Sequence, residues 1–191
     1  MRRLALVVAI LLLLLSLPLP AGFAPALAQD DGPPADPGVG STVPFVGPDG
    51  GEAARFTVEE VVDPFDGYDA FSPPERGTRY VLVSLAIENP GARPLPIDPS
   101  GFAVQDADGF LAFPVSISLL PEAEAQTPLL GYGELAGGGA TVGALAFQAF
   151  NGVDPIRVVY QPSRDRLVIL ADLRAAAGGA SGPAPAQIAP T

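Results

Sequence analysis

RYVLVSLAIEN, residues 79–89, is the stretch of the chain that decides the fold. Side chains alternate between the two faces of an extended strand, and this stretch places only branched apolar side chains on one of them. These are Val81, Val83, Leu85 and Ile87, while Leu82, Ser84, Ala86 and Glu88 fall on the other face. The alternation predicts a central core strand. Pro90 and Gly91 follow it and predict a type II turn, in which Gly91 takes a positive φ.

The same period of two recurs in shorter segments on both sides of this strand, and Gly and Pro separate them at short intervals. The other expected strands are residues 55–62, 102–105, 110–113, 141–150, 156–160 and 167–173. No segment shows a helical period that competes with this pattern. About seven or eight such strands predict an all-β fold, an immunoglobulin-like antiparallel β-sandwich. A small β-barrel is the alternative.

The first 28 residues predict a signal peptide. Arg2 and Arg3 form a positive start, residues 4–17 are almost entirely apolar, and the small-x-small pattern of a cleavage site ends at Ala28. The apolar run stops at Pro18, short of the roughly 20 residues that cross a bilayer, although a retained anchor is the alternative. We therefore expect a secreted protein, extracellular or periplasmic, with no stable membrane span after cleavage.

Two segments have compositions that cannot bury enough apolar surface to fold. Residues 29–44, QDDGPPADPGVGSTVP, predict a disordered linker, and residues 175–191 predict a disordered tail of Ala, Gly and Pro. Residues 45–174 remain as one β-sandwich domain. Its core must stabilise it alone, because the chain contains no Cys and therefore no disulfide.

Composition excludes several classes of function. The net charge is −11, and loss of Arg2 and Arg3 with the signal peptide makes it −13, so neither nucleic acid nor anionic lipid is an expected partner. All ten basic residues are Arg, and His and Cys are absent. Nucleophiles activated by His, catalytic thiols, Lys Schiff bases and imidazole or thiolate metal sites are therefore impossible. Only carboxylate chemistry remains, and it needs a cleft that raises the pKa of one acid, for which a compact sandwich of this size offers little depth. We therefore expect no enzyme activity and no cofactor.

The segment DPFDGYDAFSPPERGT, residues 63–78, carries aromatic rings and carboxylates at a spacing of three. Rings beside carboxylates suit a sugar or peptide ligand, because the ring gives apolar contact and the acid orients polar groups. The candidate ligand-binding residues are Phe65, Asp66, Tyr68, Asp69 and Phe71. We expect instead that the rings fold down to seal one end of the sandwich, with the acids facing water.

The sequence DADG, residues 106–109, resembles the start of a calcium loop, in which alternate carboxylates point inward. The remaining ligands of such a loop are missing. A hairpin turn needs the same residue types for backbone reasons, with Gly109 at a positive φ. We therefore expect a structural turn, and Asp106 and Asp108 as metal ligands are the alternative.

Two leucine pairs flank an acidic segment in residues 115–132. We expect Leu119, Leu120, Leu129 and Leu130 to close the bottom of the sandwich while the acids of residues 122–124 project into water. The alternative is an exposed apolar patch rimmed by carboxylates, which would suit a protein partner.

The order of these segments resembles a bacterial family of domains of unknown function with a telokin-like, immunoglobulin-like sandwich, related to a secreted immunoprotective antigen. The most specific parts are Glu88 and Asn89 at the end of the central strand, the DADG turn, and the Gly-x-Leu patterns at residues 133–135 and 143–147. The resemblance implies the fold and an exported location, and it supplies no catalytic residues. Lipoprotein members carry a lipidated Cys that this chain lacks.

Function is therefore expected to be binding. The first hypothesis is a secreted protein-interaction module whose partner is an unknown extracellular or cell-envelope protein, recognised through loops at one end of the sandwich. The alternatives are a small-ligand or glycan-binding protein that uses the segment from Asp63 to Phe71, and a calcium-dependent module at Asp106 and Asp108.

Overall fold

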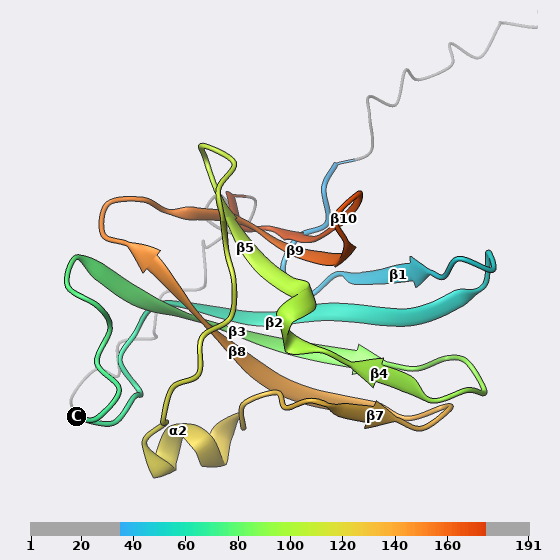
Figure 1. Ribbon diagram of the computed structural model, residues 1–191, viewed down its shortest axis with the longest axis horizontal. Helices are drawn as coiled ribbons and strands as arrows, with labels where there is room; N and C mark the ends of the chain where they lie inside the picture. The colour runs from blue at the N-terminus through green and yellow to red at the C-terminus, as the bar shows by residue number, and fades with distance from the viewer. Residues whose placement is uncertain (1–34, 175–191) are drawn as a thin grey trace, which may run out of the picture. The chain divides into compact units, whose positions relative to one another are not determined.

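Two antiparallel four-stranded sheets make up most of the computed structural model, which describes residues 35–174 (Figure 1). The expected signal peptide (residues 1–28), the first part of the expected linker (29–34) and the expected tail (175–191) lie outside the described residues.

The first sheet has the strand order β1-β2-β3-β8. Its strands are β1 (Thr42–Val46), β2 (Glu52–Phe65), β3 (Thr78–Glu88) and β8 (Ala140–Phe150). β3 pairs with β8 without interruption, from Thr78 opposite Phe150 to Glu88 opposite Ala140. The central position predicted for residues 79–89 is thus confirmed.

The second sheet has the strand order β10-β9-β5-β6. Its strands are β10 (Arg166–Asp172), β9 (Pro155–Ser163), β5 (Phe102–Asp106) and β6 (Leu111–Ala112). A short two-stranded sheet pairs β4 (Leu95–Ile97) with β7 (Gly133–Leu135), and the helical elements are η2 (Pro99–Gly101) and α2 (Pro121–Gln126). The expected immunoglobulin-like sandwich is confirmed, rather than the barrel.

The main core lies between the two sheets. Val81, Val83, Leu85 and Ile87 of β3 are all at most 1% exposed and belong to one cluster with residues of the second sheet. In this cluster the ring of Tyr160 on β9 lies 4.7 Å from that of Phe56 and 4.9 Å from that of Phe102. The aromatic side chains thus hold the first sheet against the second.

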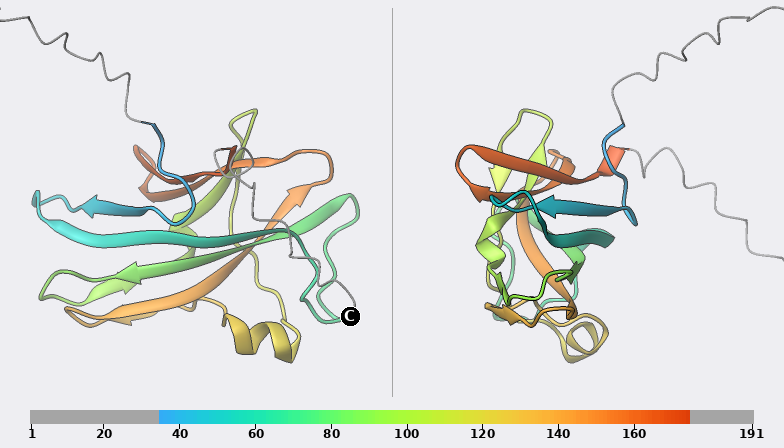
Figure 2. Two further views of the ribbon diagram at one scale, coloured as in Figure 1. Left: turned by 180° about the vertical axis from the view of Figure 1, so that it is seen from behind. Right: turned by 90° about the vertical axis from the view of Figure 1, so that its right-hand side faces the viewer.

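A second cluster covers the outer face of the first sheet. Its buried members are Phe65, Tyr80, Leu82, Ile117, Ala144 and Ala146. The segment from residue 113 to 130, which includes α2, packs over this face, and the right-hand view of Figure 2 shows α2 below the first sheet and β10 above it. Both faces of β3 are therefore buried, which explains why Leu82 and Ser84 are apolar or small.

The helix α2 was not expected from the sequence. It has six residues, too few to show a helical period, and it begins at Pro121, a residue whose missing N–H costs nothing at a helix start. Glu122 and Glu124 lie in its first turn, where the helix dipole favours negative charge. The four leucines around the helix are partly buried rather than an exposed patch, but they do not all close the bottom of the sandwich as predicted. Leu119 and Leu129 pack on the outer face of the first sheet, Leu130 packs on the main core, and Leu120 is half-buried before the helix.

The domain begins earlier than predicted. β1 starts at Thr42, inside the segment expected to be linker, and Phe45 of β1 is buried in the main core. Upstream of β1, the Pro37 carbonyl oxygen accepts the Asp172 N–H, and Asp36 pairs with Arg157 at 2.7 Å. The composition of this segment did not reveal the strand. β1 is a short edge strand with few apolar side chains and an internal Pro, and such a sequence resembles a linker.

The type II turn predicted at Pro90 and Gly91 is wrong. Gly91 has no positive φ, and its N–H instead donates to Oδ1 of Asn89 at 3.0 Å. The amide nitrogen of this buried Asn89 donates to carbonyl oxygens of Arg93, Leu135 and Ala136 at 2.8, 2.9 and 3.1 Å. One buried side chain, rather than a flexible glycine, therefore joins the turn after β3 to the turn after β7.

Candidate functional site

Three connections gather at one end of the sandwich, because the strands that lead to them are paired. Thr78 at the start of β3 lies opposite Phe150 at the end of β8, and Asp106 at the end of β5 lies opposite Pro155 at the start of β9. We call this the loop end: it consists of residues 66–77, 107–110 and 151–154 with the strand residues next to them.

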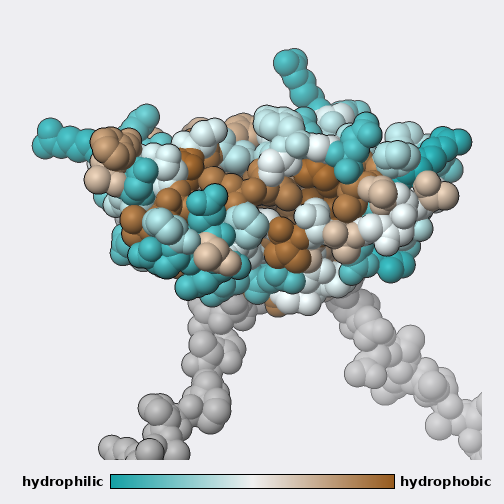
Figure 3. Space-filling model, turned by 90° about the horizontal axis from the view of Figure 1, so that it is seen from below, coloured by the Kyte–Doolittle hydropathy of each residue, from teal (hydrophilic) through white to brown (hydrophobic). Residues whose placement is uncertain are grey.

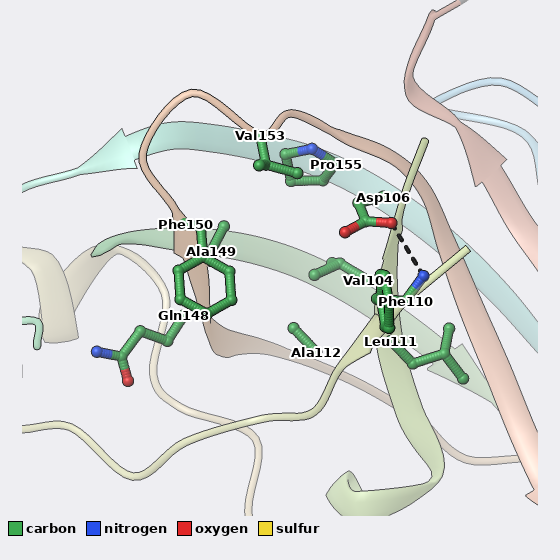
Figure 4. Close-up of a pocket in the computed structure, with 10 residues that line it drawn as sticks. All are labelled: Val104, Asp106, Phe110, Leu111, Ala112, Gln148, Ala149, Phe150, Val153 and Pro155. Atoms are coloured by element: carbon green, nitrogen blue, oxygen red, sulfur yellow. Dashed lines mark hydrogen bonds between the residues drawn. The ribbon is translucent and has the colours of Figure 1, made fainter. Parts of the chain in front are cut away.

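A hollow with a volume of about 90 Å³ lies at the loop end, between the β5–β6 hairpin and the end of β8 (Figure 4). The hairpin supplies Phe110, Leu111 and Ala112, and the opposite wall consists of Phe150, Val153 and Pro155. Its lining is thus mainly apolar.

The rings of Phe110 and Phe150 stand on opposite sides of this hollow and are largely in water. Phe110 is 74% exposed and Phe150 is 69% exposed. Scattered exposed apolar residues are common on protein surfaces, but two rings that flank an apolar hollow form a patch, and patches of this kind mark binding surfaces.

Asp106 shapes the hairpin side of the hollow. Its Oδ1 accepts the N–H of Asp108 at 3.0 Å and the N–H of Phe110 at 2.9 Å, and Gly109 between them has a φ of +89°. The predicted structural turn is confirmed. The other carboxylate oxygen of Asp106 faces the side on which Val153 lies (Figure 4).

The metal alternative finds no support in this geometry. Within residues 35–174, no three carboxylate, imidazole or thiol side chains gather where they could hold a metal ion. Oδ1 of Asp106 accepts backbone N–H groups of the turn and the side chain of Asp108 is exposed, so the described geometry of the pair is that of a hairpin turn.

Arg79 fixes the opposite wall. Its Nη1 donates to the Phe150 carbonyl oxygen at 2.6 Å, and its Nη2 donates to the Val153 carbonyl oxygen at 3.3 Å and to Asp154 at 3.1 Å. Nε and Nη2 also form a two-pronged pair with the carboxylate of Asp63. Hydrogen bonding to Asp63 raises the pKa of Arg79, so the guanidinium stays charged. The arginine thereby ties the turn after β8 to the end of β2.

The aromatic residues singled out in the loop after β2 do not form one surface. β2 continues to Phe65, whose ring is buried and folds over Gly67, where an added Cβ would lie 2.6 Å from it. Tyr68 is half-buried, with its ring edge-on to Tyr80 at 5.2 Å. Phe65 and Tyr68 thus fold inward, but onto the outer face of the first sheet rather than over the end of the sandwich as expected, and they are not candidates for ligand contact.

The remaining residues of this segment point away from that cluster. Phe71 is 94% exposed, Asp66 is exposed, and Oδ1 of Asp69 accepts the N–H of Phe71 at 2.9 Å. The predicted alternation of rings and acids as a ligand surface is therefore not assembled, because two of the three rings are turned inward.

Sequence reasoning missed the residues that do form the hollow. Phe110 follows the turn glycine of the hairpin, and Phe150 precedes Asn151 and Gly152, a dipeptide typical of tight turns. The sequence did show a large apolar side chain next to each turn, at positions that normally face water, and this could have marked both residues as unusual. The sequence alone could not show that these two rings, 40 residues apart in the chain, lie on opposite sides of one hollow.

A wider groove runs beside the outer edge of β8. It has a volume of about 430 Å³ and is lined by Leu129, Leu130, Tyr132 and the residues from Ala144 to Ala146, among others. Figure 3 shows a hollowed band of apolar side chains, bordered by hydrophilic ones, on the face that carries α2 and β7. Tyr132 at this groove is 77% exposed, close to the 74% of Phe110.

Comparison with known proteins finds a family match over most of the domain. The family model described as Domain of unknown function (DUF4352) matches residues 51–164, a range that includes both walls of the hollow. No curated protein matches the chain. Within residues 35–174, none of the helices has the length and apolar character needed to cross a membrane.

Two solved structures share the fold. The yjhA protein from Bacillus subtilis aligns with a TM-score of 0.50 and 18% identity, over 72% of this chain and 98% of its own. MPT63, a secreted protein from Mycobacterium tuberculosis, aligns with a TM-score of 0.52 and 12% identity, over 71% of this chain and 93% of its own. At these identities the likeness concerns the sandwich alone.

Proposed function

We propose, from the premise that this chain belongs to the family described as Domain of unknown function (DUF4352), that it is a binding module without enzyme activity. It acts outside the cytoplasm and binds a protein partner through the loop end. The observation that carries this proposal is the apolar hollow between the exposed rings of Phe110 and Phe150.

The geometry of the hollow supports protein binding. Protein interfaces take most of their binding energy from a few anchors, often aromatic, that sit next to desolvated pockets. Phe110 and Phe150 provide such anchors, and the backbone of each is fixed: Asp106 accepts the Phe110 N–H, and Arg79 donates to the Phe150 carbonyl oxygen. A backbone that is already fixed reduces the entropy lost on binding.

The residues at the hollow do not favour catalysis. Carboxylate hydrolases need two acids on either side of the scissile bond, one of them with a raised pKa. Among the described residues, Asp106 is the one carboxylate that lines the hollow, and its Oδ1 already accepts two N–H groups. A pair of acids for general acid and base work is therefore not assembled there.

The proposed location outside the cytoplasm has two supports. The sequence of residues 1–28 has the features of a signal peptide. One protein with the same fold, MPT63, is described as secreted. The glycan and calcium alternatives have less support, since Phe65 and Tyr68 are turned inward and Asp106 serves a turn.

Affinity capture of the native exported protein from its source cells tests the proposal. The wild type is compared with a double variant, Phe110→Ser with Phe150→Ser, and with Tyr132→Ser as the matched control of equal exposure. Urea unfolding first establishes that the three proteins are equally stable. A partner retained by the wild type and the Tyr132 control but lost from the double variant is expected. Equal retention by the double variant would refute the loop end as the binding surface.

A further inference from the structure

We propose that the hollow holds one aliphatic side chain of an extended segment of the partner, next to a lysine or arginine of the same segment. This inference rests on the proposed function and specifies the chemistry of the partner. It follows from the size of the hollow, the hydrogen-bonding state of its polar groups and the charges around it.

The lining of the hollow favours an aliphatic side chain. The hollow at the loop end is open to solvent and has a volume of about 90 Å³, which offers room for a branched side chain such as that of leucine. Leu111, Ala112, Val153 and Pro155 line it and offer no hydrogen bond from their side chains.

One carboxylate oxygen of the lining is placed to accept a hydrogen bond from a ligand. The Gln148 amide nitrogen donates to the Thr78 hydroxyl at 2.7 Å and is thus engaged. Oδ1 of Asp106 accepts two backbone N–H groups, whereas its second oxygen faces across the hollow (Figure 4). An accepting oxygen beside an apolar pocket favours a ligand that brings a donor, and a cationic donor most of all.

The surrounding charges favour a cation as well. Asp63, Asp106, Asp108 and Asp154 lie at or beside the two turns, and they outnumber the guanidinium groups of Arg79, which pairs with Asp63 and Asp154, and of Arg76 in the neighbouring loop. The side chain of Asp154 is 89% exposed and Asp108 is also in water. This excess of negative charge attracts a basic segment, and it repels a second copy of a chain whose own net charge is −11.

The test uses short peptides and the amide NMR spectrum of the isotope-labelled protein. The probe is acetyl-Arg-Leu-Arg-amide, with acetyl-Arg-Ala-Arg-amide and acetyl-Glu-Leu-Glu-amide as controls. One buried leucine gives weak affinity, on the order of millimolar, so saturating shifts are expected at high peptide concentration. Shifts should centre on Phe110, Ala112 and Val153. Replacing the leucine by alanine should weaken binding by about tenfold or more, and the acidic peptide should not bind.

Two variants locate the binding to the hollow. Ala112→Leu fills the hollow from its own wall and should abolish the shifts, whereas Ala125→Leu, at an exposed position of α2, should leave them unchanged. Asp108→Asn combined with Asp154→Asn should weaken binding and reduce its dependence on salt. Thermal unfolding of each variant shows whether the fold is intact.

The outcomes separate this inference from the proposed function. Capture of the partner could require Phe110 and Phe150 and yet be normal for the Ala112→Leu protein. In that case the proposal that the hollow holds a side chain of the partner is wrong, and the proposed function stands. Absence of shifts with the Arg-Leu-Arg peptide, or equal shifts with the acidic peptide, would overturn the inference. Self-association that Ala112→Leu abolishes would also overturn it, because a second copy would then occupy the hollow.

Discussion

Nη1 of Arg79 on β3 donates a 2.6 Å hydrogen bond to the carbonyl oxygen of Phe150 on β8, 71 residues further along the chain. The Nη2 group of the same guanidinium reaches Val153 and Asp154, and the fork as a whole pairs with Asp63. The strand that organises the sandwich therefore also fixes one wall of the candidate binding site.

Arg79→Lys should destabilise the domain by about 2 kcal/mol, since a lysine cannot reproduce the planar fork of a side chain that is only 17% exposed. Amide hydrogen exchange should accelerate in residues 150–155 more than in the rest of the domain. Urea unfolding and exchange mass spectrometry measure the two effects. Arg76→Lys, at an exposed position of the neighbouring loop, is the control and should be neutral. A uniform increase in exchange would argue against a local role of Arg79.

Asn89→Ala should cost about 3 kcal/mol. The substitution leaves the carbonyl oxygens of Arg93, Leu135 and Ala136 without their side-chain donor at a site where Asn89 is 3% exposed. Asn151→Ala, at an exposed turn, should change the free energy of unfolding by less than about 0.5 kcal/mol. Urea unfolding of both variants measures the two changes in the free energy of unfolding. Equal changes would mean that the buried hydrogen bonds of Asn89 are dispensable.

Gly109→Val should destabilise the fold more than Asp106→Ala. The valine must adopt a φ of +89°, at a cost of about 1 to 3 kcal/mol or more for a β-branched residue, while the alanine loses two exposed hydrogen bonds worth about 1 kcal/mol. Gly131→Val is the control, because Gly131 has open space and no positive φ. A larger loss from Asp106→Ala, or a rise in the thermal midpoint with Ca²⁺, would instead indicate a metal site.

Asp172 should make stability depend on pH in the acidic range. Its hydrogen bond and ion pair with Arg174 lower its pKa from 3.8 to about 2. A carboxylate with a lower pKa in the folded state stabilises the fold above its unfolded pKa, and this contribution is lost as pH falls through the folded value. Asp172→Asn should therefore be less stable than the wild type at neutral pH, and the gap should shrink between about pH 4 and pH 2. A gap that stays constant would mean that Asp172 acts through packing alone.

The sandwich could be predicted because its strands and turns are encoded by short, local sequence patterns. The alternation in residues 79–89 and the turn residues around it identify a central strand without knowledge of its partners. β1 and α2 were missed because they are too short to show a period in the sequence. β1 has five residues, one of them a proline, and α2 has six. The sequence did not predict the second cluster on the outer face of β3, although it placed the apolar Leu82 on that face.

The candidate site was not predictable, because pairing between distant strands creates it. Phe110 and Phe150 flank one hollow only because β5 pairs with β9 and β8 turns into β9. The spacing of Phe65, Tyr68 and Phe71 suggested a ring surface, but β2 runs on to Phe65 and turns that ring inward. Local patterns thus predicted the turn at Asp106, and only the structure showed where the rings of the loop pack and which residues line the hollow.

The most direct test of the loop end as the binding surface is photo-crosslinking in the source cells. A photoreactive phenylalanine analogue replaces Phe110, Phe150 or Tyr132 in the full chain, one position at a time. Phe110 and Tyr132 are 74% and 77% exposed, so their chance of random contact is the same. We predict one protein adduct common to positions 110 and 150 and absent from position 132. Adducts from position 132 alone, or none from positions 110 and 150, would contradict the account.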